Sequence, residues 1–428
     1  FIGTGYVGLV SGVVMGHLGH NVTCTDVDSS KIKMLQNKQP PIYEAELEEY
    51  LIKYANTDRL NFTDQFDGSL AKAQCVFITV GTPPLADGSA DLSIVFKVIE
   101  AICPYVNTKC VFVLKSTVPP GTCDKVQEFI NTQGYSNSVA SNPEFLREGS
   151  AISDFIKPDR IVIGANDQST FEVMRDVYKP LTDQNIPLLE TDLCTSELIK
   201  YASNTFLANK IAFINELSDL CEIVGADVNK LSEGIGLDQR IGRKFLNPGP
   251  GFGGSCFPKD ILALQNLVKK VDSDFLILDA IINSNSARPQ KMVKNIVAKM
   301  GGDVADKKIT ILGLTYKANT DDLRASPAIK IINELEYYGA KIVAYDPEGM
   351  KNSKNYFSDL ECANSLLEAV KDSDAIIIVT EWSEFKNFDY SKIYTQMKTP
   401  MIFDLRNILS GPKLKKLGFL YHSIGKKS

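Results

Sequence analysis

The residues best suited to chemistry in this sequence stand at the end of a glycine- and proline-rich stretch. Residues 247–260 read NPGPGFGGSCFPKD, so a thiol, an amine and a carboxylate follow the glycines at Cys256, Lys259 and Asp260. Glycine accepts positive φ and lets a ligand approach the backbone, which makes this stretch a candidate wall of a binding site. Cysteine attacks as the thiolate, a form that a nearby cation or base favours. The spacing therefore suits covalent catalysis, with Lys259 supplying charge and Asp260 accepting a proton.

A structural interpretation of the same residues stays open. Free cysteine commonly packs as a small hydrophobic residue, so Cys256 could equally be a core residue after a glycine-rich turn. The stretch alone does not decide between a nucleophile and a core residue. The decision depends on what else the chain carries.

A dinucleotide-binding fingerprint opens the sequence. Gly3, Gly5 and Gly8 form the pattern Gly-x-Gly-x-x-Gly, which begins an apolar helix-like run, and Asp26 ends the strand predicted at residues 21–27. The glycines allow a tight turn, close approach of a pyrophosphate and close helix packing, while the helix amino end attracts the phosphates. Asp26 suits the ribose hydroxyls and would repel a ribose phosphate, so the sequence predicts NAD rather than NADP. A glycine-rich turn without a ligand is the alternative, which the complete context disfavours.

Composition limits the class of protein. The 428 residues carry a net charge of −6, with 44% hydrophobic and 23% charged residues, which is typical of a globular protein of two or three domains. The acidic balance argues against nucleic acid or an anionic membrane as a partner. No apolar run approaches the ~20 residues that a membrane span needs.

Cysteine and histidine usage narrows the chemistry. Nine cysteines occur without a Cys-x-x-Cys pair, and the three histidines are His17, His20 and His422. An odd number of scattered cysteines favours reduced thiols in the cytoplasm over disulfides or a zinc site. So few histidines give little support to a Ser-His-Asp triad or to a histidine general base, and we expect no metal site. The fingerprint begins at Phe1, so we expect the natural chain to start earlier.

Strands of the buried type alternate with helical stretches through the first part of the chain. They are predicted at residues 74–81, 110–117, 138–141 and 159–165. The alternation predicts an α/β fold with a doubly wound parallel sheet. Ligands bind such sheets at the carboxyl ends of strands, where the polar candidates are Thr82, Ser116, Thr117, Glu144 and Glu148. Solvated loop carboxylates are the alternative for the two glutamates.

An uninterrupted helical pattern without proline covers residues 195–225. It predicts a helix about 45 Å long, which would join two domains. Lys200 and Asn204 are four residues apart and therefore share one face of that helix. The pair would point an amine and an amide at a common site, whereas a solvated face is the alternative.

A second alternation of strands and helices starts at Lys307 and lacks the glycine fingerprint. It predicts a second doubly wound, Rossmann-like domain that binds something other than a second NAD. Lys317, Arg324 and Arg406 follow its strands and could receive phosphates, although surface ion pairs are the ordinary alternative.

The assembled motifs closely resemble the UDP-glucose/GDP-mannose dehydrogenase family of nucleotide-sugar dehydrogenases. The resemblance covers nearly the whole chain and includes GTGYVG, VGTPP, KSTVPPGT, NPEFLREGSAISDFIKPDRIVIG, ELIKYASNTFLANKIAFINE, DQRIGRKFLNPGPGFGGSCFPKD and NTDDLRASPA. The chain departs from the family pattern in PIYEAELEE, which lacks a common Pro-Gly, and in a truncated first strand.

The resemblance implies a body of three parts: an NAD-binding Rossmann domain at 1–192, a central helical dimerisation region at 193–300 and a UDP-sugar-binding Rossmann-like domain at 301–428. It implies a cytoplasmic homodimer or higher homo-oligomer. The implied activity is the oxidation of UDP-glucose to UDP-glucuronate for polysaccharide biosynthesis, with two NAD reduced per sugar.

The resemblance also implies residue roles. Lys200, Asn204 and Asp260 would organise a water or alkoxide, Cys256 would form a thiohemiacetal and then a thioester, and Thr117 with Glu144 would hold the hydrolytic water. A thiol is needed because an aldehyde cannot lose hydride until a nucleophile makes it tetrahedral. The residues expected near NAD are Gly3, Gly5, Tyr6, Val7, Gly8, Asp26, Lys31, Thr82, Glu148 and Arg324. Those expected near the UDP-sugar are Phe145, Leu146, Lys200, Asn204, Phe245, Gly253, Tyr316, Lys317, Arg406 and, from a partner copy, Arg240.

Other activities remain alternatives at this point. GDP-mannose and UDP-N-acetylmannosamine dehydrogenases share the cysteine mechanism, whereas a two-electron 3-hydroxyacid dehydrogenase uses Lys and Asn on a long helix without the thiol. A catalytically silent NAD-binding protein is the alternative outside the enzymes. Counting NADH per substrate separates the four-electron from the two-electron reaction.

Overall fold

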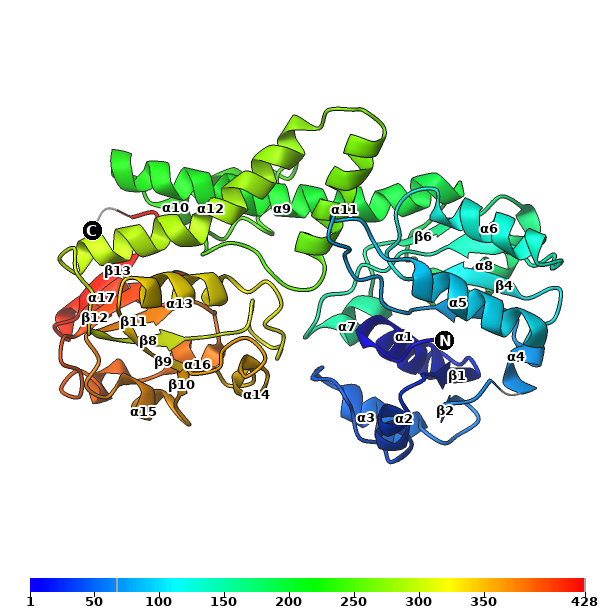
Figure 1. The fold of residues 1–428 in the computed structure, drawn as a ribbon, viewed down its shortest axis with the longest axis horizontal. Coiled ribbons are helices and arrows are strands. Elements are labelled where there is room, and N and C mark those ends of the chain that lie inside the picture. Colours follow the sequence, from blue (N-terminus) through cyan, green and yellow to red (C-terminus); the bar gives the residue numbers. More distant parts are fainter. Residues whose placement is uncertain (67, 427–428) are drawn as a thin grey trace. The chain divides into compact units, whose positions relative to one another are not determined.

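The computed structural model describes residues 1–66 and 68–426 and divides into two compact units. Unit 1 comprises Phe1–Ser203 and Leu262–Ser273, and unit 2 comprises Asn204–Ile261 and Asp274–Ser428. One long helix, α9 (Leu193–Val224), contributes residues to both units (Figure 1). The predicted helix at residues 195–225 is thereby confirmed.

The sheet of unit 1 is built around the first residues of the chain. Ile2 bridges Thr25 in one strand and Ile78 in another, and so joins the pair β1-β2 to the run β3-β4-β5-β6-β7. If the extended residue Ile2 is counted as the first strand, the sequence of neighbours β2, β1, Ile2, β3, β4 and β5 is the doubly wound order 3-2-1-4-5-6. The strands are β1 (Val22–Thr25), β2 (Leu60–Thr63), β3 (Cys75–Ile78), β4 (Val111–Leu114), β5 (Val139–Ser141), β6 (Ile161–Gly164) and β7 (Leu188–Thr191).

One pair in this sheet corrects the expectation of a wholly parallel sheet. β5 and β6 pair antiparallel, through Ser141 and Gly164, whereas every other paired strand of the unit is parallel. The connection between these strands contains α7 (Ala151–Ile156), which packs against α1 (Tyr6–His17). This connection is therefore not a crossover between parallel strands, and β6 runs in the direction opposite to β5.

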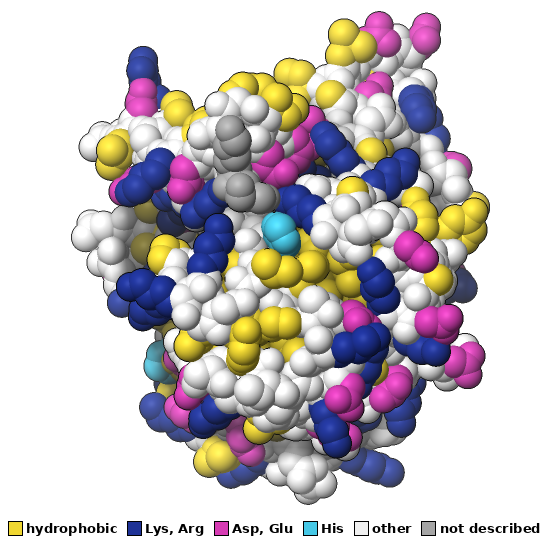
Figure 2. All heavy atoms as spheres, turned by 90° about the vertical axis from the view of Figure 1, so that its left-hand side faces the viewer, with side chains coloured by type: hydrophobic (Ala, Val, Ile, Leu, Met, Phe, Trp, Pro, Cys, Tyr) yellow, Lys and Arg dark blue, Asp and Glu magenta, His cyan; other side chains and the backbone are white. Residues whose placement is uncertain are grey.

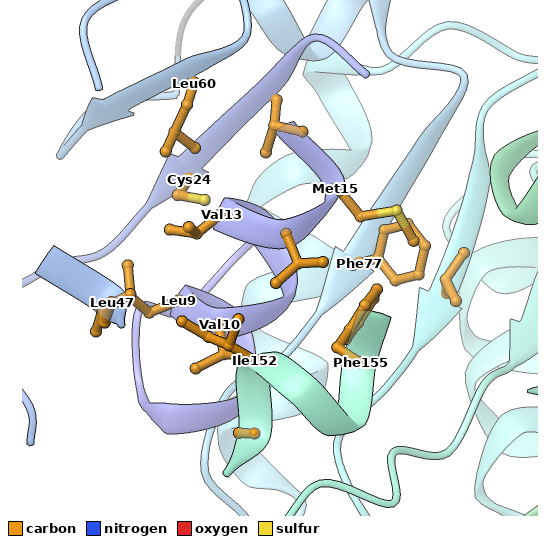
Figure 3. Close-up of a cluster of buried hydrophobic side chains, with 14 of the residues drawn as sticks. Leu9, Val10, Val13, Met15, Cys24, Leu47, Leu60, Phe77, Ile152 and Phe155 are labelled. Carbon is orange, nitrogen blue, oxygen red and sulfur yellow. The ribbon is translucent and has the colours of Figure 1, made fainter. Parts of the chain in front are cut away.

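Helices cover both faces of this sheet because its strands are apolar on both sides. Val111 and Val113 of β4 belong to the core beneath α1, α7 and α8, while Phe112 and Leu114 belong to the core beneath α5 and α6. Figure 3 shows the first core, in which side chains of α1 meet Phe77 and side chains of α7. The remaining helices are α2 (Ser29–Gln36), α3 (Leu47–Tyr54), α4 (Gly68–Lys72), α5 (Ser93–Ile102), η1 (Cys103–Tyr105), α6 (Thr122–Thr132) and α8 (Gln168–Thr182).

Unit 2 contains a second doubly wound sheet, as predicted, and all its strands are parallel. The order β10-β9-β8-β11-β12-β13 is again 3-2-1-4-5-6 when counted along the chain. The strands are β8 (Lys308–Leu312), β9 (Lys341–Tyr345), β10 (Glu361–Cys362), β11 (Ala375–Ile378), β12 (Met401–Asp404) and β13 (Leu420–Ser423). The helices are α10 (Val228–Gly236), α11 (Phe257–Lys270), which ends within unit 1, α12 (Leu276–Lys299), α13 (Pro327–Tyr337), α14 (Met350–Ser353), α15 (Leu366–Val370), α16 (Ser383–Asn387), η2 (Tyr390–Lys392) and α17 (Gly411–Lys416).

The two units repeat one backbone arrangement after their first strand. Gly3 has φ of +100° and donates to Thr25 at the end of β1, and Gly313 has φ of +99° and donates to Tyr345 at the end of β9. The next residue after each of those strands is an aspartate. Asp26 accepts from the backbone of Thr4, and Asp346 accepts from the backbone of Leu314. The second unit therefore keeps the turn of a Rossmann domain without its glycine fingerprint.

Asp346 is fully buried, and backbone or side-chain donors engage both of its oxygens. One oxygen accepts from Leu314, from the backbone and hydroxyl of Thr315, and from the indole of Trp382; the other accepts from Glu348 and Gly349. Trp382 is the single tryptophan of the sequence, so its fluorescence reports on this part of unit 2.

Replacing Asp346 by asparagine should destabilise unit 2 by about 2–4 kcal/mol, because the new amide group faces backbone donors whichever way it is turned. Urea unfolding followed by tryptophan fluorescence measures the loss. Asp306→Asn is the matched control, since Asp306 is 83% exposed and pairs only with Lys341 among the described residues. Equal unfolding midpoints in the two variants would contradict the assigned role.

Candidate active site

The glycine fingerprint in unit 1 leaves space where a pyrophosphate would approach. A Cβ atom added to Gly3 would lie 3.0 Å from the carbonyl oxygen of Thr79, and one added to Gly8 would overlap the Thr79 hydroxyl. At Gly5, directly before α1, an added Cβ would meet nothing within 4 Å. Two glycines are therefore required by packing within the protein, while the third borders open space at a helix amino end.

Asp26 is held in the orientation that a ribose-binding carboxylate needs. One of its oxygens accepts from the backbone and hydroxyl of Thr4, at 2.7 and 2.8 Å, and the other from the backbone of Asp28 at 3.0 Å. Partial burial acts to raise the pKa of Asp26, but the hydrogen bonds from Asp28 and Thr4 outweigh it and lower that pKa. The carboxylate stays ionised and, unlike Asp346, is only partly buried.

Other predicted cofactor residues lie around this turn. The Tyr6 hydroxyl accepts from the backbone of Gly149 at 2.7 Å, next to Glu148, and Val7 is in the first turn of α1. Lys31 lies on α2, with its amine 4.0 Å from Asp28.

Thr82 and Thr117 are brought together by the sheet, as their positions after adjacent strands predict. The Thr82 hydroxyl donates to the carbonyl of Thr117 at 2.8 Å. Ser116 donates in turn to the carbonyl of Val80 at 2.6 Å. The loops after β3 and β4 are thus tied to each other at the carboxyl end of the sheet.

Glu144 and Lys200 form a buried ion pair. Their charged atoms are 2.8 Å apart, and their side chains are only 5% and 4% exposed. Burial alone would raise the pKa of Glu144, but the charge and hydrogen bond of Lys200, with a hydrogen bond from the backbone of Leu146, lower it. The carboxylate is therefore ionised and oriented, which excludes the solvated-loop interpretation of Glu144.

Phe145 is flanked by cations. The guanidinium carbon of Arg160 lies 3.5 Å from the centre of its ring and the amine of Lys200 lies 5.4 Å away. The backbone just beyond is fixed by Glu44, which accepts from Gly149 at 2.7 Å and Ala151 at 2.8 Å. Glu44 belongs to the PIYEAELEE segment, so the segment that departs from the family pattern orders the NPEFLREG loop.

In unit 2, Cys256 stands directly before α11. Its carbonyl accepts the helical hydrogen bond from Asp260, and its sulfur lies 3.5 Å from the Ser255 hydroxyl. The side chain is half-buried, whereas five of the other cysteines are fully buried. A helix amino end carries partial positive charge that stabilises an anion, which suits a thiolate better than a core thiol.

Asp260 is buried one turn after Cys256 and is held from two sides. Asn204 of α9 donates to one oxygen at 2.7 Å, and the amine of Lys259 lies 2.6 Å from the other. Asp260 is 1% exposed and Asn204 is 5% exposed. The predicted partnership of Asn204 and Asp260 is therefore a direct hydrogen bond, and Lys259 pairs with the carboxylate.

The glycine-rich loop packs against the loops at the carboxyl ends of β8 and β12. A Cβ on Gly253 would overlap the carbonyl of Ala325, and one on Gly254 would lie 2.7 Å from the ring of Tyr316. Arg406 donates to the carbonyl of Tyr316 at 3.0 Å and lies beside Gly249. Gly253, Tyr316 and Arg406 are thus neighbours, and the amine of Lys317 lies 5.6 Å from the centre of the Tyr316 ring.

Three residues that pattern reasoning missed fix this loop. Asn215 accepts from the backbone of Gly249 at 2.8 Å, Asn285 accepts from the backbone of Phe252 at 2.8 Å, and buried Arg288 donates to the carbonyl of Gly249 at 3.1 Å. Asn215 follows Asn204 by three helical turns on α9, and that spacing is the signal that would have found it.

Three other predicted substrate and cofactor residues make local side-chain contacts, although the backbone carbonyl of Arg324 accepts from Gly254 of the glycine-rich loop at 2.8 Å. Arg240 is 89% exposed and pairs with Asp238, and Arg324 is 58% exposed and pairs with Asp322. Phe245 has φ of +66°, and its ring centre lies 6.2 Å from that of Phe257.

Unit 2 also has a pocket of about 260 Å³ whose lining contains none of the predicted site residues. Met292, Phe403 and Leu405 supply apolar surface, while Asp219 pairs with buried Arg288 and with the exposed Lys291. Figure 2 shows one face of the molecule on which hydrophobic side chains gather near a histidine and are bordered by basic ones.

Within residues 1–66 and 68–426, no three His, Cys, Asp or Glu side chains are grouped as metal ligands, and no helix is long and apolar enough to span a membrane.

Three models of a single family match this chain. They describe the UDP-glucose/GDP-mannose dehydrogenase family: its NAD binding domain matches residues 1–182, its central domain 194–287 and its UDP binding domain 310–411.

Named relatives and solved structures agree with these matches. UDP-glucose 6-dehydrogenase of Rickettsia typhi is 54% identical over 432 residues, which cover 100% of this chain and 99% of the relative. A UDP-glucose dehydrogenase structure from the hyperthermophilic archaeon Pyrobaculum islandicum has a TM-score of 0.90 at 36% identity, covering 100% of this chain and 97% of that one. A UDP-D-ManNAc dehydrogenase structure from Pyrococcus horikoshii has a TM-score of 0.86 at 27% identity, covering 99% and 98%. With an NAD binding, a central and a UDP binding domain all matched, this chain belongs to the UDP-glucose/GDP-mannose dehydrogenase family and is an NAD-dependent oxidoreductase.

Proposed function

We propose that this protein oxidises UDP-glucose to UDP-glucuronate in two steps that each reduce one NAD. The observation that carries the proposal is a half-buried thiol at the start of α11, one turn before a buried carboxylate held by Asn204 and Lys259. A two-electron alcohol dehydrogenase has no use for such a thiol, because hydride loss from an alcohol needs no covalent intermediate. The relative at 54% identity, whose name specifies UDP-glucose, supports this sugar over GDP-mannose and UDP-N-acetylmannosamine.

The residues of the fingerprint fit the cofactor. Gly5 borders open space at the amino end of α1, and Asp26 is an ionised, partly exposed carboxylate next to it. NAD, when bound, accepts a hydride in each oxidation. Gly3, Gly8, Tyr6 and Val7 shape the turn, and we assign Lys31, Thr82, Glu148 and Arg324 to the rest of the cofactor.

Lys200, Asn204 and Asp260 act on the sugar 6-hydroxyl in the first oxidation. The hydroxyl loses its proton through a water ordered by Asp260, and Lys200 stabilises the negative oxygen. A positioned cation of this kind supplies several kcal/mol in a buried site, roughly the 3–4 kcal/mol seen on removing one oxyanion donor. Asn204 keeps Asp260 in place by its hydrogen bond.

Cys256 acts on the aldehyde that results. Its thiolate attacks the carbonyl carbon and gives a thiohemiacetal, whose loss of a second hydride leaves a thioester. Water held by Thr117 and Glu144 attacks the thioester, which releases the acid and restores the thiolate. Phe145, Leu146, Phe245, Gly253, Tyr316, Lys317 and Arg406 are assigned to the UDP-sugar, and Arg240 to the site of a partner copy.

We further propose the three-part division at residues 1–192, 193–300 and 301–428, a cytoplasmic location and a homodimer formed through α9. Phe206, Phe213 and Leu220 recur every seven residues on that helix and are 65%, 51% and 50% exposed. Such a stripe of large apolar side chains is typical of an interface. Arg240, which is largely exposed, would then be free to reach a second copy.

Cys256→Ser should lower the rate of UDP-glucuronate formation by about three orders of magnitude or more, because serine is a far weaker nucleophile at neutral pH. The assay measures NADH absorbance and acid formation over a panel of nucleotide sugars. Wild-type protein should yield two NADH per UDP-glucose, and Cys362→Ser, an exposed cysteine of the same unit, should match it. One NADH per sugar, preference for another sugar, or an active Cys256→Ser would refute the proposal.

Asp26→Ala should weaken the binding of NAD by about 10- to 100-fold, since a charged hydrogen bond to ribose is worth roughly 1.5–3 kcal/mol. It should also reduce the preference for NAD over NADP. Isothermal titration calorimetry with each cofactor measures both. Asp183→Ala, an exposed change on the same unit, is the control. An unaltered preference would count against the ribose assignment.

Phe213→Glu should shift the protein from dimer toward monomer and raise the dissociation constant at least about 100-fold, since it places a charge in an apolar interface. Sedimentation velocity over a range of concentrations measures this. Tyr337→Glu, at a residue that is 84% exposed on α13, should leave assembly unchanged. A wild-type monomer, or equal behaviour of both variants, would contradict the interface.

A further inference from the structure

A buried lysine of unit 1 has no role in the chemistry assigned above. Lys115 follows β4 at the start of KSTVPPG and is only 4% exposed. Its amine donates to the side-chain oxygen of Asn142 at 3.0 Å and lies 3.4 Å from the Tyr178 hydroxyl, and it stands 5.5 Å from the centre of the Phe155 ring. Among the described residues no carboxylate pairs with it directly.

Holding an ammonium group there is costly. Burial of a cation without a counter-ion disfavours folding unless hydrogen bonds or nearby charge compensate it. Burial lowers the pKa of Lys115 to about 8. The negative charge of Glu144 acts to raise this pKa, and the positive charge of Lys200 lowers it further. At neutral pH the group is therefore mostly protonated, and a methionine would fill the same space at a lower cost.

The nearby charges indicate what the lysine does. Glu144 pairs with Lys200, and the charge of Lys115 adds to the effects that lower the pKa of Glu144. The titratable groups that act on this carboxyl are Lys200 from α9 and Lys115 from the end of β4. Lys200 also has to stabilise an oxyanion in the proposed reaction, and while it does so Glu144 needs another cation.

The same lysine fixes the backbone that carries Glu144. Asn142 accepts from Lys115 and from the Tyr178 hydroxyl, and donates to the carbonyl of Val162 at 2.8 Å. Its backbone donates to the carbonyl of Leu114 at 2.9 Å. Asn142 is two residues before Glu144, so its anchoring sets where the glutamate leaves the sheet.

We propose that Lys115 is a positioning residue that holds Glu144 ionised and oriented for thioester hydrolysis. It does so as a second cation, besides Lys200, that acts on Glu144, and through its hydrogen bond to Asn142. The inference rests on the proposed function, because it takes Glu144 as the residue that activates the hydrolytic water. No proton leaves Lys115 during the reaction.

The sign of the expected pH effect follows from charge. Removing a cation near a carboxylate raises its pKa, so the acid limb of the kcat profile should move to higher pH in Lys115→Met, by about one unit. At pH 7 Glu144 stays ionised even after such a shift, because its pKa starts below the ordinary value for a glutamate. The fall in kcat expected there, about tenfold, therefore comes from the lost hydrogen bond to Asn142, which positions Glu144. The KM for NAD should stay within about twofold, because fingerprint binding does not involve Glu144.

Three variants of the full-length protein test this inference. Lys115→Met should accumulate the covalent thioester, seen by mass spectrometry of acid-quenched single turnovers, whereas Lys115→Arg should retain the acid limb of wild type. Tyr178→Phe removes a hydrogen bond to Asn142 without changing charge and should leave the acid limb in place. A Lys115→Met protein with a wild-type profile and no thioester would overturn the proposal, as would a Lys115→Arg protein whose acid limb moves upward.

A readout that does not need turnover separates this inference from the proposed function. Titration of the Glu144 carboxyl by ¹³C NMR, assigned with Glu144→Gln, should show its pKa raised by about one unit in Lys115→Met. An unchanged titration would overturn the role of Lys115 even if the enzyme is active. A wild-type protein that makes no acid would refute the proposed function. The NMR titration would still show whether Lys115 lowers the pKa of Glu144.

Discussion

One turn of α9 separates Lys200 from Asn204, and the proposed chemistry depends on that spacing. Each side chain is fixed by a buried carboxylate, Lys200 by Glu144 and Asn204 by Asp260. Breaking the buried Glu144–Lys200 pair would cost several kcal/mol, roughly the 3–5 kcal/mol seen when a buried pair is broken. The helix therefore presents an amine and an amide in defined orientations, and neither can turn away without losing a hydrogen bond to a buried carboxylate.

The two doubly wound units use one backbone scaffold for different purposes. Each has a glycine near φ of +100° after its first strand and an aspartate after its second. Asp26 is partly buried and keeps room to accept from a ligand, whereas Asp346 is fully buried and accepts six hydrogen bonds from within the protein. The aspartate after the second strand is thus left partly exposed in unit 1 and is enclosed by protein donors in unit 2, and burial makes the difference.

The glycine-rich loop before Cys256 shows how a flexible sequence becomes a rigid wall. Its glycines are needed because Tyr316 and Ala325 approach too closely for any side chain. Asn215, Asn285 and Arg288 then bind its backbone groups, so little freedom is left. The proposed nucleophile at the end of this loop would thus be held still before substrate arrives, which lowers the entropic cost of reaching the reactive geometry.

The sequence alone determined the features whose physical cause is local. The glycine fingerprint, the long proline-free helix with Lys200 and Asn204 on one face, and most central strands follow from backbone permissiveness and from periodicity, which neighbouring residues encode. The edge strands β2, β7, β10 and β13, the antiparallel β5–β6 pair and the anchors Asn215, Asn285 and Arg288 were not predicted. Tertiary structure also decided that Lys115 is buried against Asn142 and that donors within the protein occupy both oxygens of Asp346. Burial and partner choice depend on residues far apart in the chain, and no local pattern records which of them will meet.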